Sequence, residues 1–390
     1  MATQTRYYGF GLAKRPDLSG RRMANNGQHA ARWMPMVEEA AKQPYVGITT
    51  DGKPVPDLYP VRKTGHTTRP ITDAANEFLA TLSNSQRSSV LFDIDSREWQ
   101  RWFNISPYVF RHGLLLEDLT ELQRHAAMAM IEATLSEAGY ESMRNCMRLN
   151  HTIGEITDNM EEYGEWVYFL SIFGSTSYDE PWGWQLDGHH VNLHCFVMGD
   201  QIVFTPTFLG SEPVVATTGV YKGVSVMQEE ERAGLAMMKL LDKRQRQTAI
   251  VSDELRGAFT GAFRDNFELK YEGVRADVLS TGQQELLLDL IGVYVGRIRP
   301  GHDAVKLDEV REHMAETYFA WMGPEPAADS VFYYRVHSPV ILIEFDHQAG
   351  VAFDNKTPSR NHIHTIVRTP NGNDYGKDLL RQHHESHKHG

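Results

Sequence analysis

The sequence predicts an α+β protein, in which a helical N-terminal half packs with an antiparallel β-sheet that carries two histidine clusters. Two observations support this prediction. Between residues 70 and 165, apolar residues recur at the spacing of amphipathic helices, as at Leu119, Leu122 and Ala126. Residues 166–208 and 331–368 instead form short apolar and aromatic runs separated by turn residues, a pattern typical of strands and hairpins.

The chain divides into three parts by composition. Residues 1–66 are rich in Gly, Pro, Asn and Arg, which predicts an extended arm and loops with one short helix near 30–42. Residues 67–376 are expected to form a single α+β body, in which the helical segment 229–321 is an insertion between the two strand regions. Residues 377–390 form a histidine-rich tail, of the kind that binds metals opportunistically. No internal repeat is visible in the sequence.

Charge and hydropathy exclude several classes of partner. The chain has 39 Lys+Arg against 51 Asp+Glu, a formal net charge of -12, so its surface repels nucleic acid and anionic membranes. No run of about 18 apolar residues predicts a membrane-spanning helix, and the N-terminus lacks the apolar core of a signal peptide. We therefore expect a cytoplasmic protein, unless a signal has been removed. Cys146 and Cys195 are expected to be core thiols.

The most informative residues are histidines within predicted strands. Side chains alternate along a strand, so His190 and His194 of the run DGHHVNLH are expected on one face and His189 on the other. A bulge just before the pair would exchange His189 and His190. In the run NHIHT, His362 and His364 share a face. Imidazoles from two strands can converge on one Zn, Cu, Fe or Ni ion. The alternative is that these histidines only form hydrogen bonds within a polar cleft.

Two carboxylates and two arginines complete the candidate site. Glu344 and Asp346 share a face of the strand that precedes the NHIHT segment, where a metal ligand or a general base is expected. Arg111 and Arg368 have the planar guanidinium that binds a substrate carboxylate through two hydrogen bonds. An ion pair within the protein would explain either arginine equally well.

Four sequence blocks resemble the DUF3500 family, over roughly residues 70 to 385. They are WGWQLDGHHVNLH, TPTFLGSEP, YYRVHSPVILIEFD and NHIHTIVRTPNGNDYG. The resemblance implies that His189, His190, His362 and His364 are stronger ligand candidates than His194, where similar proteins often carry Asn or another residue. The family name implies no activity.

Three functions are compatible with these residues. The first is a metal-dependent hydrolase or lyase acting on a small polar or carboxylated molecule, with one divalent ion, zinc above all, activating a water. The second is an oxidoreductase with non-haem iron or copper, because two histidines and a carboxylate also suit Fe(II). The third is a non-catalytic small-ligand-binding protein, or a metal-free enzyme with histidine as acid and base. A homo-oligomer is compatible with all three.

Overall fold

A computed structural model describes residues 35–387 except 37, 41, 106–109, 161 and 328. Most of the predicted N-terminal arm and His389 of the tail lie outside these residues, whereas the described part of the 30–42 segment is helical. The described chain contains the following helices: α2 (Arg69–Ala80), α3 (Asn84–Val90), α4 (Glu121–Thr134), α5 (Glu137–Thr157), α6 (Gln228–Leu240), α7 (Lys243–Ala249), α8 (Thr281–Val295), α9 (His302–Glu312) and α10 (Lys377–His387). None of the helices within these residues is long and apolar enough to cross a membrane.

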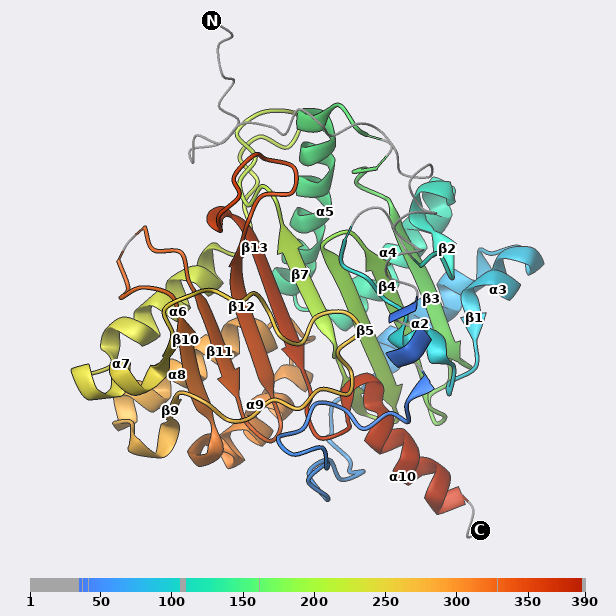
Figure 1. The fold of residues 1–390 in the computed structure, drawn as a ribbon. Coiled ribbons are helices and arrows are strands. Elements are labelled where there is room, and N and C mark those ends of the chain that lie inside the picture. The colour runs from blue at the N-terminus through green and yellow to red at the C-terminus, as the bar shows by residue number, and fades with distance from the viewer. Residues whose placement is uncertain are drawn as a thin grey trace, which may run out of the picture.

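One mixed sheet of 13 strands runs through the described structure (Figure 1). The strands are β1 (Leu91–Phe92), β2 (Leu114–Leu115), β3 (Tyr168–Gly174), β4 (Trp182–Gly188), β5 (Val191–Met198), β6 (Gln201–Val203), β7 (Thr207–Ser211), β8 (Ile250–Ser252), β9 (Val274–Arg275), β10 (Tyr318–Met322), β11 (Tyr333–His337), β12 (Leu342–Gln348) and β13 (Ser359–Arg368). Their order is β1-β3-β4-β5-β7-β13-β12-β11-β10-β8.

The α+β class is confirmed, with two corrections. The sheet is not purely antiparallel, because β1 pairs with β3 and β8 pairs with β10 in parallel. The N-terminal half is not simply helical either, because β3 to β7 all lie before residue 212. The predicted hairpin is present, with β5 and β6 paired around Gly199–Asp200.

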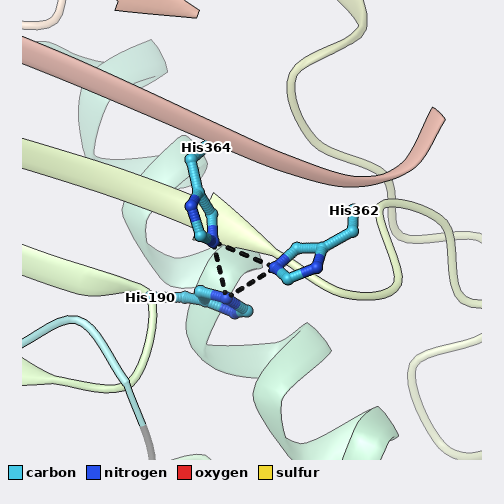
Figure 2. Close-up of side chains that lie close together, drawn as sticks. All are labelled: His190, His362 and His364. Atoms are coloured by element: carbon cyan, nitrogen blue, oxygen red, sulfur yellow. Dashed lines mark hydrogen bonds between the residues drawn. The ribbon is translucent and has the colours of Figure 1, made fainter. Parts of the chain in front are cut away.

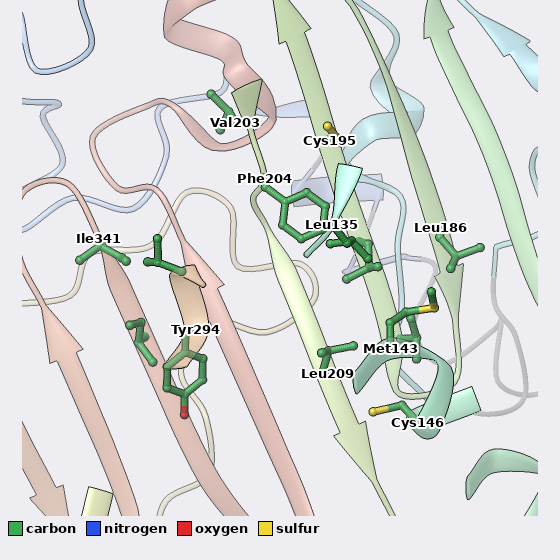
Figure 3. Packing of buried hydrophobic residues seen from close by; sticks show 14 of the residues in the cluster. Leu135, Met143, Cys146, Leu186, Cys195, Val203, Phe204, Leu209, Tyr294 and Ile341 are labelled. Carbon is green, nitrogen blue, oxygen red and sulfur yellow. The ribbon is translucent and has the colours of Figure 1, made fainter. Parts of the chain in front are cut away.

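The two faces of the sheet differ in chemistry. Helices cover one face, and the apolar side chains of alternate strand residues pack against them to form the main core. Figure 3 shows part of this core, with Met143 and Cys146 of α5 on the same side of the sheet as Leu186 and Leu209. Both cysteines are buried and free.

The opposite face carries buried polar residues and is covered by loops. Residues 253–273, between β8 and β9, cross the front of β11 to β13 (Figure 1). In this loop the amides of Phe259 and Thr260 donate to Glu344, and the amide of Ala258 donates to Asp346. Because a buried carboxylate needs such donors, the loop and the polar strand residues stabilise one another.

Counted inward from either edge, the sheet has the same arrangement: an edge strand is parallel to its neighbour, and the next strands are antiparallel. This symmetry reveals an internal duplication. The row Leu91–Ile172–Trp184–Cys195 crosses β1, β3, β4 and β5. The row Ile250–Trp321–Tyr334–Phe345 crosses β8, β10, β11 and β12 in the same way. The two halves, 69–211 and 228–368, meet where β7 pairs antiparallel with β13. Residues 229–321, which the sequence suggested were an insertion, therefore correspond to the first part of the chain.

Helix caps repeat in the two halves as well. Gln86 of α3 and Gln123 of α4 close capping boxes, and their side-chain amides bond to each other. Gln245 of α7 and Gln283 of α8 do the same. A shared architecture with this shared detail indicates that the halves are equivalent, although few residues are identical.

Candidate metal centre

His190 lies in a tight turn, not within a strand as the alternation of side chains predicts. β4 ends at Gly188 and β5 begins at Val191, so His189 and His190 form the two-residue connection. His190 has a φ of 63°, a left-handed conformation that is uncommon for residues other than glycine. Its amide donates to Asn104 O at 3.1 Å and its carbonyl accepts from Gly210 N at 2.8 Å. These bonds fix the turn against β7.

His362 and His364 project from the same side of β13 toward His190 (Figure 2). The Nε2 atoms of the three rings lie 3.2 Å (His190–His362), 3.2 Å (His190–His364) and 2.9 Å (His362–His364) apart. Within the described residues, this is the group of side chains that could hold a metal ion. The structure thus brings together three of the five predicted histidine ligands.

The geometry of the three nitrogens fits a first-row transition metal. Ligand nitrogens lie about 2.0–2.1 Å from zinc, which separates two of them by about 3.3 Å in a tetrahedral site and by about 2.9 Å at octahedral angles. The three observed separations span 2.9–3.2 Å. Among the described residues no fourth protein ligand joins these three nitrogens, so an ion bound by them would keep an open position.

The protonation states also suit metal binding. Burial, followed by repulsion from neighbouring imidazoles, lowers the pKa of His190 and of His364 well below the usual value, so both rings are neutral. His362 Nδ1 lies 2.7 Å from Ala349 O and can only donate to this carbonyl. The other ring nitrogen of His362, Nε2, faces the other two rings. Such a carbonyl partner is the usual support of a metal-binding histidine.

Glu212 holds the loop that orients His362. This buried carboxylate accepts hydrogen bonds from the amides of Val351, Ala352 and Phe353 at 3.0–3.3 Å. Its Oε2 atom also lies 3.7 Å from His362 Nδ1. The three amides follow Ala349, so the carboxylate fixes the position of the carbonyl that orients the imidazole.

Gly210 provides the space in which two of the rings meet. It lies on β7 directly opposite His364 on β13. A Cβ atom at this position would lie 2.8 Å from His364 Cδ2 and 2.9 Å from His190 Cδ2. Any side chain here would therefore push the two rings apart.

His189 and His194 lie outside this group. The ring of His189 stacks on His190 with centroids 3.9 Å apart, and its Nδ1 atom lies 2.7 Å from Asn150 Oδ1. His194 points from β5 toward Pro206 O, 2.7 Å from Nδ1, and toward Gln185 Nε2, 2.8 Å from its own Nε2. Burial lowers the pKa of both histidines to about 3. Because the GHH pair forms a turn, His190 and His194 do not share a site.

Asp346 is the carboxylate nearest to the centre by strand register. It pairs with His364 across β12 and β13, so both side chains lie on the polar face. Its Oδ2 atom accepts from Ala258 N and from the Gln348 amide, whereas Oδ1 is buried without a hydrogen-bond partner in the described structure. Burial, with repulsion from Glu344, raises the pKa of Asp346 to about 8.

Glu344 and Arg368 are held in internal networks. Glu344 accepts hydrogen bonds from Phe259 N and Thr260 N, both at 2.8 Å, and from the Tyr333 hydroxyl at 2.6 Å. Each nitrogen of the Arg368 guanidinium donates a hydrogen bond in a second network: to Asp374 Oδ2 at 2.8 Å, to Asp265 Oδ1 at 2.6 Å and to Thr260 O at 2.8 Å.

Arg111 lies half-buried in the loop before β2. The structure thus places Asp346 opposite His364 in the strand pairing, and places Glu344 and Arg368 in hydrogen-bond networks of the polar face.

The family model of DUF3500, described as a protein of unknown function, matches residues 64–377. The chain belongs to the DUF3500 family. The match includes both histidine segments and both halves of the duplicated architecture. Neither the curated proteins nor the solved structures contain a match to this DUF3500 chain.

Sequence reasoning did not identify the residues that support the three histidines. Gly210 and Glu212 lie in the block TPTFLGSEP, which contributed only to the family resemblance. A carboxylate two residues after a glycine is too common a pattern to indicate a role. The pairing of β7 with β13, which brings these two residues to the histidines, is a long-range contact.

Proposed function

We propose that this protein is a metal-dependent hydrolase or lyase that acts on a small polar or carboxylated molecule. The observation that carries the proposal is the convergence of three imidazole Nε2 atoms within 3.2 Å of one another. Three histidines with one open position are the donor set of catalytic zinc sites, in which the metal keeps room for water or substrate. Zinc is therefore the proposed ion, with iron or copper as the alternatives.

A divalent ion at this site would polarise a carbonyl oxygen and lower the pKa of water to about 7. His190, His362 and His364 would hold it, with their rings oriented by the turn, by Ala349 O and by the space at Gly210. Ring stacking of His189 on His190 supports the same orientation.

Asp346 is the proposed proton acceptor in its ionised form, whose fraction grows as the pH rises toward the raised pKa of about 8. Its Oδ1 atom has no partner in the described structure, and its strand position places it beside His364. A general base must reach the proton that it accepts, and a free carboxylate oxygen on the same face meets this requirement better than Glu344, whose oxygens are already bonded. Arg111 remains the proposed contact for the anionic end of the substrate.

We place this activity in the cytoplasm, with a small molecule as substrate and without nucleic acid or membrane as partner. The net charge of -12 supports the second part of this proposal. Two buried free thiols are compatible with a reducing compartment.

The test is elemental analysis of the full chain, purified without a tag, beside the double variant His190→Ala, His362→Ala. We expect about one equivalent of zinc in the wild type and less than about a tenth in the variant, because two of three ligands are removed. The matched control is His383→Ala, His387→Ala, which removes two histidines from α10 and should retain the metal.

Equal metal content in wild type and the His190, His362 variant would refute the site. Stoichiometric iron or copper, with oxygen consumption, would favour the oxidoreductase instead. The role of Asp346 is tested separately: Asp346→Asn should keep the metal while hydrolysis of activated esters falls about 10²-fold or more. Unchanged hydrolysis in this variant would exclude Asp346 as the base.

A further inference from the structure

Because the two halves of the sheet are equivalent, the region around the metal-centre residue His190 has a counterpart elsewhere in the sheet, which we call the second pole. His190 lies in the turn between β4 and β5, and the matched strand rows make Val340, in the 338–341 turn between β11 and β12, its equivalent. His364 of β13 pairs with Asp346 of β12. The equivalent of Asp346 in β5 is Phe196, and Phe196 pairs with Val203 of β6. Two valines thus occupy the positions of two metal ligands.

The turn at Val340 is held by side chains of the protein, whereas the equivalent turn at His190 faces the metal centre. The Lys306 ammonium of α9 donates to Val340 O at 2.8 Å and to Glu309 Oε1 at 2.7 Å. The Tyr59 hydroxyl lies 3.2 Å from Pro339 O. An ammonium group has three donors, so Lys306 keeps one N–H beyond these two bonds. The second pole therefore has a cation of its own, supplied by a side chain.

A cavity of ≈ 270 Å³ opens beside this cation. Its walls come from the 57–64 segment, β6 and α9, and a smaller space of ≈ 70 Å³ continues behind Tyr59, Ile202 and Val203. Helix α9 and the 57–64 segment therefore enclose this space from two sides.

The cavity is lined by both signs of charge and by an apolar wall. Lys306 and Arg62 supply positive charge, whereas Asp57, Glu309 and Glu312 supply negative charge. Ile202, Val203, Val305 and Leu379 form the apolar part of the lining. A ligand that carries one charge of each sign on a small apolar body would match all three features, because each of its charges would meet the opposite charge while its apolar part is buried against the apolar wall.

We propose that this second pole binds a small zwitterion of the α-amino-acid class. The carboxylate is received by the remaining N–H of Lys306 and by Arg62, and the ammonium group faces Glu309 and Glu312. The apolar side chain lies against Ile202 and Val203. The site is independent of the proposed hydrolase function, since it shares no residue with the metal centre.

The test is isothermal titration calorimetry on the full chain with three probes of one carbon skeleton: L-leucine, 4-methylpentanoate and 3-methylbutylamine. We expect L-leucine to bind at least about ten-fold more tightly than either probe with a single charge. Lys306→Met should weaken the binding of leucine by about ten-fold or more, while the metal content of the protein stays unchanged.

Glu312→Gln, at an exposed position, provides a second variant in case Lys306→Met does not fold, and it should weaken leucine but not 4-methylpentanoate. The proposal is overturned by an absence of leucine binding up to about 10 mM. It is equally overturned if 4-methylpentanoate or 3-methylbutylamine binds as tightly as leucine, because the cavity would then not recognise a zwitterion.

Discussion

His190 Nε2 and His364 Nε2 lie 3.2 Å apart, although 174 positions separate the two residues in the chain. His190 belongs to the first half of the duplicated architecture, and His364 belongs to the second. A metal ion held by both would connect the halves next to the strand pair β7·β13. The metal centre is thus expected to contribute to stability as well as to chemistry.

Removal of the metal should lower the thermal stability of the protein. An ion that binds only the folded state stabilises it by about 2.7 kcal/mol when its free concentration is a hundred times the dissociation constant. We expect a chelator to lower the melting temperature and added zinc to restore it, as measured by differential scanning calorimetry. The double variant His190→Ala, His362→Ala should show no response to either addition. A response of equal size in the variant would place the stabilising ion elsewhere.

Gly210→Ala should weaken metal binding without unfolding the chain. The added Cβ would come within 3.0 Å of the rings of both His190 and His364, so at least one ring must move from its place. We expect the dissociation constant for zinc to rise about ten-fold or more, measured by competition with a chromophoric chelator.

The matched control for this substitution is Gly292→Ala in α8, where the new Cβ would meet nothing within 4 Å. This variant should bind zinc normally and gain about 0.5–1 kcal/mol of stability, because alanine is the better helix former. Normal zinc affinity in Gly210→Ala would show that the space at this position is not required.

Glu212→Gln should also reduce metal affinity, by about 10–100-fold, as loss of an outer-shell partner does in other metal sites. A glutamine side chain directs an NH₂ group at amides that now donate to a carboxylate, so the loop that carries Ala349 must shift. The measurement is zinc competition, together with the absorption spectrum of the cobalt-substituted protein, which reports ligand geometry. Glu285→Gln, an exposed change on α8, serves as control. An unchanged cobalt spectrum in Glu212→Gln would contradict the orienting role.

Asp187 should make stability depend on pH. Burial raises the pKa of this carboxyl to about 8, while Phe103 N donates to Oδ1 at 3.0 Å. In the unfolded chain the pKa returns to about 3.9, so the stabilising contribution is fully present below about pH 4 and is lost as the pH rises toward 8. Asparagine keeps the acceptor for Phe103 and does not titrate.

The variant Asp187→Asn should therefore gain stability relative to wild type as the pH rises. The expected gain between pH 5 and pH 7 is at most about 1.4 kcal/mol per pH unit, measured by urea denaturation. Asp289→Asn, an exposed change on α8, should show no such trend. A constant difference between Asp187→Asn and wild type across this range would mean that Asp187 is ionised in the folded protein.

The sequence was sufficient to predict the α+β class, the β5–β6 hairpin and the orientation of His362 and His364 on one strand face. Each of these follows from local rules, namely residue periodicity and turn chemistry. The same alternation was misleading at His190 and His194, because it assumes a continuous strand and the chain turns at His189–His190. Only the left-handed conformation of His190 reveals this turn, and no residue type in the run requires it.

The sequence by itself determined the residues available for metal chemistry: imidazoles in two β segments, with a carboxylate pair one loop before the second. Tertiary structure alone decided which of them meet. The pairing of β7 with β13 brings Gly210 opposite His364, and the β4–β5 turn adds His190 to the group. It also decided that Asp346 pairs with His364 across β12 and β13, while Glu344 and Arg368 are bonded within the scaffold. The physical reason is that strand register between distant segments depends on the packing of the whole sheet, which local periodicity does not encode.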